Sequence, residues 1–186
     1  MENSKTTIMI RCALFTALIA VSAFIQIPLP FMDYYTLQFL FVLLSGMILG
    51  SKNGALSVAV YVLIGLIGIP IFASGGGLMY IFKPTFGYLL GFIATSFVVG
   101  YIVEKNNART FSQYFVGAFA GLIITYTFGI LYKFIILNFY MGTPAHLYIL
   151  FLSCFPLDIP GDIVLCCASA VIMPRLRPIV CRVNPY

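Results

Sequence analysis

The sequence predicts an all-α integral membrane protein, a polytopic bundle of six transmembrane helices in a single domain that spans residues 1–186. Composition is the first reason: 62% of the residues are hydrophobic and 8% are charged, whereas roughly a quarter of the residues of a soluble domain are charged. Mean hydropathy is +1.07. A water-soluble chain of 186 residues could not bury that much apolar surface. The second reason is that long apolar runs recur from one end of the chain to the other.

These runs predict the individual helices, because proline, glycine and polar clusters separate them. Pro28 closes the first run, Ser51 to Gly54 reads as a turn between the second and third, and Glu104 to Arg109 closes the fourth. Leu147–Cys154 is apolar but too short to span, so an interfacial or re-entrant position is expected. The second and third runs are also shorter than the roughly 20 residues of a straight span. The predicted helices are about 10–27, 36–50, 55–69, 85–103, 114–140 and 160–176.

A glycine-rich loop at 70–84 is the central feature of this pattern, since it separates two apolar runs and carries Gly75, Gly76 and Gly77. Consecutive glycines can adopt positive φ and let a ligand approach the backbone, at an entropic cost. Two interpretations stay open. The segment is a formed lid over a ligand, or it is a flexible surface connector.

The distribution of cations predicts the orientation in the membrane. With six spans, both termini lie on one side, which would carry most cations, while Lys83 would lie on the other side and Lys133 inside a helix. Such a bias is typical of the cytoplasmic side. We therefore expect cytoplasmic termini and an outward 70–84 loop. The cations on the predicted cytoplasmic side are Lys5, Arg11, Lys52, Lys105, Arg109, Arg175, Arg177 and Arg182.

Two carboxylates at the start of the last helix are the main candidate polar groups. Asp158 and Asp162 flank Pro160-Gly161 at a spacing of four residues. Acidic residues in a first helical turn are ordinary capping chemistry, which is the simpler interpretation of Asp158. Asp162 precedes an apolar run, and a carboxylate at membrane depth costs about 2.5–3.5 kcal/mol, so a partner or a ligand is expected for it.

The sequence lacks the motifs that are typical of enzymes, metal sites and nucleotide-binding sites. It contains no Walker-type phosphate loop, no metalloprotease His-Glu pair and no nucleophile elbow. Its single histidine and five cysteines show no metal-ligand spacing, and the positive charge fits membrane topology better than nucleic-acid binding. We expect no catalytic residues, no metal and no cofactor.

Several short motifs then occur in a defined order along nearly the whole chain. They are Pro28-Leu-Pro30, Thr36-Leu-Gln38, Leu49-Gly50 with Gly54-Ala-Leu, Tyr61 through Ala73, Pro84-Thr85 with Gly87-Tyr88, and Pro160-Gly161-Asp162. In these motifs the chain resembles the BioY family of biotin-uptake S-components. The resemblance implies the substrate-binding subunit of an energy-coupling-factor (ECF) vitamin transporter in a prokaryotic cell membrane. It also implies three partners, a coupling membrane subunit and two ATP-binding subunits, which drive uptake.

The chain departs from the family pattern at two places. The family usually reads Gly-Pro-Thr-Gly-Gly-Tyr where this chain has Lys83-Pro-Thr-Phe86-Gly-Tyr88, and it usually has a lysine where this chain has Leu165. Both departures fall in the expected binding region, so a related vitamin or a biotin analogue is an alternative substrate. Because Leu165 replaces the family's lysine, Lys83 would pair with the ligand anion from the lid side. In the simpler interpretation, Lys83 only reaches water at the membrane surface.

The expected binding residues combine apolar walls with a few polar groups, as a bicyclic ligand requires. The first candidate is Asp162, and the others are Gln38, Phe72, Gly76, Tyr80, Lys83, Thr85, Tyr88 and Asp158. On the first helix, Ala13, Ala17 and Ala20 form a small-residue stripe that continues to Ala23. Ala13 and Ala17 resemble the family's docking surface for the coupling subunit, although internal packing is the simpler interpretation. A non-transport membrane assembly subunit remains an alternative from another class.

Overall fold

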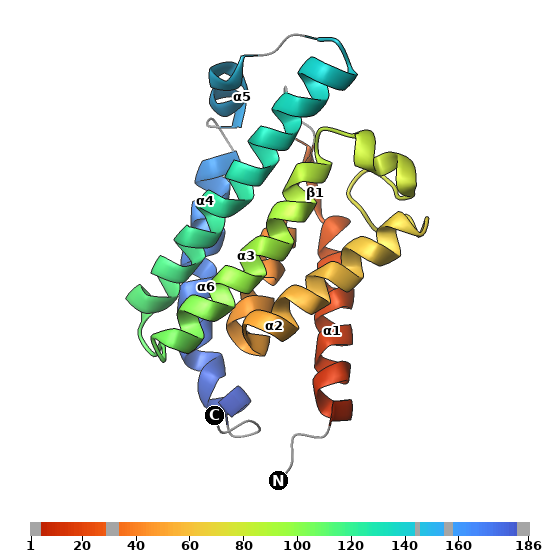
Figure 1. The fold of residues 1–186 in the computed structure, drawn as a ribbon. Coiled ribbons are helices and arrows are strands. Elements are labelled where there is room, and N and C mark those ends of the chain that lie inside the picture. Colours follow the sequence, from red (N-terminus) through yellow and green to blue (C-terminus); the bar gives the residue numbers. More distant parts are fainter. Residues whose placement is uncertain (1–4, 29–33, 144–145, 155–157, 182–186) are drawn as a thin grey trace.

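The computed structural model describes residues 5–28, 34–143, 146–154 and 158–181 and consists mainly of helices (Figure 1). The long helices are α1 (Lys5–Ala23), α2 (Gln38–Leu66), α3 (Phe86–Lys105), α4 (Phe111–Ile135) and α6 (Asp158–Cys181). Shorter elements are the 3₁₀ helix η1 (Leu78–Phe82), the π-helical turn η2 (Ile136–Tyr140) and α5 (Leu147–Cys154). Two three-residue strands, β1 (Gln26–Pro28) and β2 (Tyr34–Thr36), pair antiparallel.

The described chain contains five helices that are long and apolar enough to cross a membrane, so the predicted count of six spans is not confirmed. The predicted helices 36–50 and 55–69 are two parts of α2, which changes direction sharply at Gly50 (φ 83°, ψ 178°). The turn predicted at Ser51 to Gly54 is wrong, because these residues are helical. Only glycine adopts such a φ without strain, so a single residue makes the turn that the sequence pattern assigned to four.

A carboxylate from α3 explains why the helix can restart immediately after this bend. The backbone N–H of Ser51 donates to Glu104 Oε1 (3.1 Å), and the Ser51 hydroxyl donates to Glu104 Oε2 (2.8 Å). The side chain of Glu104 therefore caps the first turn of the second half of α2, where a negative charge is favourable.

The ends of α1 and α6 also differ from the prediction. Helix α1 ends at Ala23 and not at 27, because Gln26 to Pro28 pair with β2. Helix α6 continues past Pro174 to Cys181. Membrane helices tolerate an internal proline, since neighbouring groups satisfy the backbone carbonyl that it leaves without a donor.

The helices pack in an order that places the functional elements at one end. Helix α2 packs against α3 and α1, and α4 packs against α3 and α6. The start of α1 and the end of α6 lie at one end of the bundle, which we call the terminal end, whereas β1, η1 and α5 lie at the other, the loop end (Figure 1).

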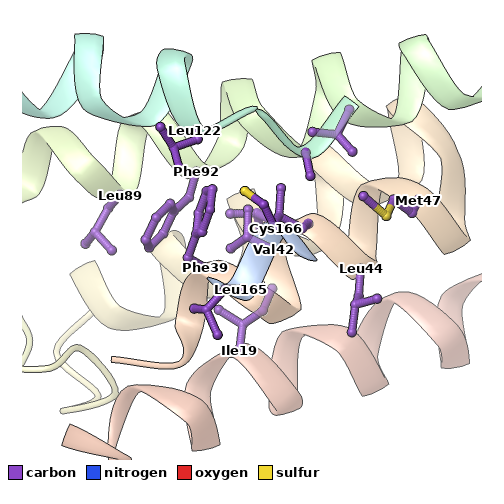
Figure 2. Close-up of a cluster of buried hydrophobic side chains, with 14 of the residues drawn as sticks. Ile19, Phe39, Val42, Leu44, Met47, Leu89, Phe92, Leu122, Leu165 and Cys166 are labelled. Atoms are coloured by element: carbon purple, nitrogen blue, oxygen red, sulfur yellow. The ribbon is translucent and has the colours of Figure 1, made fainter. Parts of the chain in front are cut away.

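An apolar core joins all five long helices between these two ends (Figure 2). Leu165 of α6, at the position where the family usually has lysine, is 8% exposed and lies in this core. Figure 2 shows it among the labelled side chains of the core, which include Ile19 and Phe39. At this position α6 therefore supplies an apolar side chain to the core.

Candidate functional site

The glycine-rich segment 70–84 packs against the rest of the chain and forms its own backbone contacts, as a formed loop would. Phe72 and Gly75 form an antiparallel bridge. The N–H of Gly77, which has a φ of 100°, donates to the carbonyl of Gly65 in α2 (2.7 Å). A side chain at Gly76 would place its Cβ 2.4 Å from the carbonyl oxygen of Ile69. The glycines thus let the segment fold tightly back onto the end of α2.

Side chains from three other parts of the chain hold the same segment. The hydroxyl of Tyr61 in α2 donates to the carbonyl of Ile71 (3.1 Å), and the hydroxyl of Tyr132 in α4 donates to that of Ile81 (2.6 Å). The side-chain amide of Gln26 donates to the carbonyl of Ala73. Each contact satisfies a backbone acceptor that a loop would otherwise leave to water.

Six side chains at the loop end form a connected group that we call the loop cluster: Gln38, Tyr61, Phe72, Tyr80, Lys83 and Thr85. Five of them were predicted as site residues, and Tyr61 was not. The ring of Phe72 lies 5.5 Å from that of Tyr61 and 4.6 Å from that of Tyr80 between centroids. Phe72 and Tyr80 are buried, at 1% and 4% exposure.

Polar contacts surround the hydroxyl of Tyr80 in this cluster. Ser74 donates to it (3.2 Å), and Thr85 Oγ1 lies 3.5 Å from it. Lys83 is exposed, and its Nζ donates to the carbonyl of Ser74 (2.9 Å) and lies 4.9 Å from the centre of the Tyr80 ring. The lysine therefore connects Ser74 to the end of the 70–84 segment. The negative electrostatic potential on the face of the Tyr80 ring also attracts the lysine ammonium group.

A second group, the helix cluster, consists of Tyr88, Tyr126 and Asp162 from α3, α4 and α6. The hydroxyl of Tyr126 donates to Asp162 Oδ2 (2.8 Å), and the ring of Tyr88 meets that of Tyr126 edge-on at 5.9 Å. Tyr88 lies directly against Gly129, where a Cβ would fall 2.4 Å from the ring. Asp162 is 8% exposed, so the hydrogen bond from Tyr126 partly replaces the water that the carboxylate has lost.

Most of the predicted site residues thus belong to one of two clusters, five of them to the loop cluster and two, Tyr88 and Asp162, to the helix cluster. Asp158 starts α6, one turn before Asp162. Phe86, the second departure from the family pattern, is buried and packs its ring 5.7 Å from that of Tyr132. Among the described residues, no group of three or more histidine, cysteine or acidic side chains could hold a metal ion.

The residues that sequence analysis missed are the tyrosines that support the predicted ones. Tyr61 lies one helical turn before Gly65, and a Cβ at Gly65 would lie 2.1 Å from the Phe72 ring. Tyr126 likewise precedes Gly129 by three residues, so each tyrosine shares a helix face with a glycine that makes room for an aromatic ring. That pairing is the signal that could have found them.

Ala13 and Ala17, the predicted docking residues, lie on the exposed face of α1, whereas Ala20 is partly buried and Ala23 is fully buried. The four alanines therefore do not share one environment. Their interpretation as a single internal packing stripe fails for the first two.

With this geometry established, comparisons with known proteins identify the family. The model of the BioY family matches residues 1–182. The chain belongs to the BioY family. A probable biotin transporter BioY from Lysinibacillus sphaericus is 40% identical over 95% of this chain and 89% of its own length. The biotin transporter BioY of Thermotoga maritima is 46% identical over 72% of this chain and 75% of its own length.

A solved structure agrees with the BioY assignment. The crystal structure of the S-component for biotin from an ECF-type ABC transporter matches with a TM-score of 0.80 and 28% identity over 96% of this chain and 95% of that one. The chain is a multi-pass membrane protein. The prediction that it is not an enzyme is confirmed, because the BioY family consists of transporter components.

Proposed function

We propose that this chain is the substrate-binding S-component of an ECF-type ABC transporter, and that it captures biotin outside the cell for ATP-driven uptake. The observation that carries the proposal is the match, over almost the full length of both chains, to a solved S-component for biotin. Relatives named biotin transporters support the same substrate.

The proposed partners are a coupling membrane subunit and two ATP-binding subunits in a prokaryotic cell membrane. In the proposed orientation both termini are cytoplasmic and the loop end faces outward. Cations support this orientation. Most of those in the described chain belong to the terminal end of the bundle, whereas Lys83 and Lys133, which is in the last turn of α4, lie toward the loop end (Figure 1). A cation-rich side is the cytoplasmic side in most multi-pass proteins.

Biotin would bind between the loop cluster and the helix cluster. Phe72, Tyr80 and Tyr88 would supply aromatic contacts, as apolar ring systems require, and Thr85 would supply a polar one. Gln38 lies behind this layer, where its amide donates to Tyr61. Gly76 would let the backbone of the lid approach the ligand. Asp158 would add negative charge at the rim of the site.

Asp162 is the strongest candidate for a direct polar contact. Its carboxylate would accept from a donor N–H of the ureido ring, in addition to the hydrogen bond that Oδ2 accepts from Tyr126 (2.8 Å). A carboxylate that is buried this deeply gains from each donor it acquires, because bulk water is absent.

Lys83 would serve the opposite end of the ligand. Its ammonium group donates to the carbonyl of Ser74, and a ligand carboxylate is a stronger acceptor than a backbone carbonyl. With Leu165 in the apolar core, we assign neutralisation of the valerate carboxylate to Lys83, which belongs to the 70–84 segment itself.

A binding titration tests this function directly. The purified chain in detergent should bind biotin with a 1:1 stoichiometry, whereas an Asp162→Ala variant should bind much more weakly and elute as a folded protein. Parallel titrations with biotin analogues and with other vitamins distinguish the substrates. Tight binding of another vitamin with no binding of biotin would reassign the substrate. No binding of any vitamin would favour the assembly-subunit alternative.

The proposed docking surface requires a separate uptake experiment. Ala13→Leu with Ala17→Leu should abolish biotin uptake in cells that carry the coupling and ATP-binding subunits, because larger side chains prevent close helix approach. Biotin binding by the purified variant should persist. Thr127→Leu enlarges an exposed position on α4 and is the matched control. Unchanged uptake in the double variant would remove α1 as the docking surface.

A further inference from the structure

A buried chain of hydrogen bonds connects the start of α2 to the glycine-rich segment. The side-chain amide of Gln38 donates to the hydroxyl of Tyr61 (2.6 Å), and this hydroxyl donates to the carbonyl of Ile71 (3.1 Å). Gln38 is 3% exposed and Tyr61 is fully buried. The contacts bridge three parts of the chain that lie 23 and 10 residues apart.

The direction of these hydrogen bonds follows from the acceptor at their end. A backbone carbonyl can only accept, so the single proton of the Tyr61 hydroxyl must point at Ile71. The oxygen of that hydroxyl must then accept, and Gln38 Nε2 is the donor it meets. The hydroxyl of Thr36, 3.3 Å from Gln38 Oε1, occupies the other end of the amide. An amide at position 38 thereby directs the tyrosine proton toward the loop.

Aromatic packing extends the same connection into the proposed lid. The Tyr61 ring meets Phe72 edge-on, and Phe72 packs against Tyr80. Gly65 makes this possible, because any Cβ there would overlap the Phe72 ring. The N–H of Gly77 also bonds to Gly65, so Tyr61 and Gly65 hold both ends of residues 71–77 on one helix face.

We propose that Gln38 and Tyr61 are positioning residues that hold residues 71–77 closed over bound biotin and so set the rate of its release. This inference rests on the proposed function. The sequence predicted that Gln38 contacts the ligand. In this proposal Gln38 instead orients the hydroxyl of Tyr61. Loss of the link opens the segment more often without removing any group that touches biotin.

The first test replaces only the hydroxyl. Tyr61→Phe keeps the ring packing and removes one buried hydrogen bond, for which we expect roughly two- to tenfold faster biotin dissociation. The association rate should change little. Tyr114→Phe is the matched control, because Tyr114 is 1% exposed and its hydroxyl donates to the carbonyl of Ala108 (2.8 Å) in the α3–α4 turn. This control loses a similar bond at the terminal end and should keep the wild-type dissociation rate.

The second test reverses the hydrogen-bond direction while leaving the tyrosine intact. Gln38→Glu presents a carboxylate that accepts the proton of Tyr61, so the carbonyl of Ile71 loses its donor. Dissociation should accelerate by a factor similar to that of Tyr61→Phe, and the double variant should be no faster than either single one. Non-additivity of this kind is the mark of two residues in one chain of contacts.

Amide hydrogen exchange separates the proposed action from a general loss of stability. Both single variants should exchange faster at residues 71–77 and normally in α4, with or without biotin. Equal dissociation rates in Tyr61→Phe and wild type would overturn the proposal. So would additive losses in the double variant, which would mean that Gln38 contacts biotin directly. If the wild-type chain does not bind biotin, the proposed function fails, and the exchange pattern alone still decides whether the link holds the segment.

Discussion

The two ends of the bundle connect α2 to its neighbours by opposite means. At the terminal end α2 and α3 touch through their backbones. A Cβ at Gly46 would fall 2.4 Å from the Ser96 carbonyl oxygen, and a Cβ at Gly100 would fall 2.4 Å from the Ser51 nitrogen. At the loop end, α2 meets the 70–84 segment through one backbone hydrogen bond at Gly65 and otherwise through long side chains, of which Tyr61 is the clearest case.

This difference indicates where motion and binding are possible. Two helices whose backbones touch cannot separate without breaking their packing, because no side chain lies between them that could change rotamer. A tyrosine or a lysine can exchange one partner for another by a change of rotamer. We therefore expect the terminal end to remain rigid and the loop end to respond to ligand. Four predictions test this comparison, in order of decreasing effect.

The largest effect concerns which end faces outward. A membrane-impermeant maleimide added to intact cells should label Ser74→Cys at the loop end completely and leave Asn106→Cys at the terminal end unlabelled. Both positions are exposed. The unsubstituted chain gives the background from its native cysteines, and Asn106→Cys should react once the membrane is permeabilised. Labelling of Asn106→Cys alone in intact cells would reverse the proposed orientation.

The second prediction concerns rigidity at the terminal end. Gly100→Ala places a methyl group against the backbone of Gly50 and Ser51, which cannot move aside, so the variant should lose about 3 kcal/mol of stability. Thermal unfolding in detergent measures the loss. Gly117→Ala in α4 is the control, because its nearest contact would be an ordinary 3.7 Å. Equal stability of the two variants would mean that α2 and α3 can separate at this point.

The third prediction concerns exchange of partners at the loop end. Lys83→Ala should weaken binding of biotin by roughly 2 kcal/mol, the lower part of the range for truncating one partner of a charge pair, because Lys83 is exposed. It should hardly affect biotin methyl ester, which lacks the charge. Titration of both ligands against both proteins measures the difference. An equal loss for acid and ester would show that Lys83 acts only by holding Ser74.

The sequence predicted the regions of this structure that depend on local pattern. Apolar runs identified the membrane class and located α3 and α4 within a few residues, because a helix in lipid must satisfy its own backbone. The resemblance identified the BioY family. The predicted site residues Phe72, Tyr80 and Thr85 lie in one cluster.

What the sequence did not reveal depends on contacts between distant residues. The helix restarts directly after the bend at Gly50, where Glu104, 53 residues after Ser51, caps Ser51. Ser51 to Gly54 therefore has the composition of a turn and the structure of a helix. Tyr126 was missed for a similar reason, since its partner Asp162 is 36 residues away. Local pattern carries no information on such pairs.

The smallest expected effect tests whether the two ends are independent. Glu104→Gln keeps the shape of the cap on Ser51 and removes its negative charge, which favours the start of the second half of α2. Because Glu104 is exposed, we expect a loss of only about 1 kcal/mol in thermal stability. The dissociation constant for biotin should not change, because this cap lies at the terminal end and the binding clusters lie at the loop end.

Ser51→Ala, which removes the hydroxyl donor and leaves the carboxylate, should cause a similar loss of thermal stability and serves as the control. If Glu104→Gln weakened biotin binding while Ser51→Ala did not, the charge at the bend would influence the loop end through α2. The two ends would then be energetically coupled.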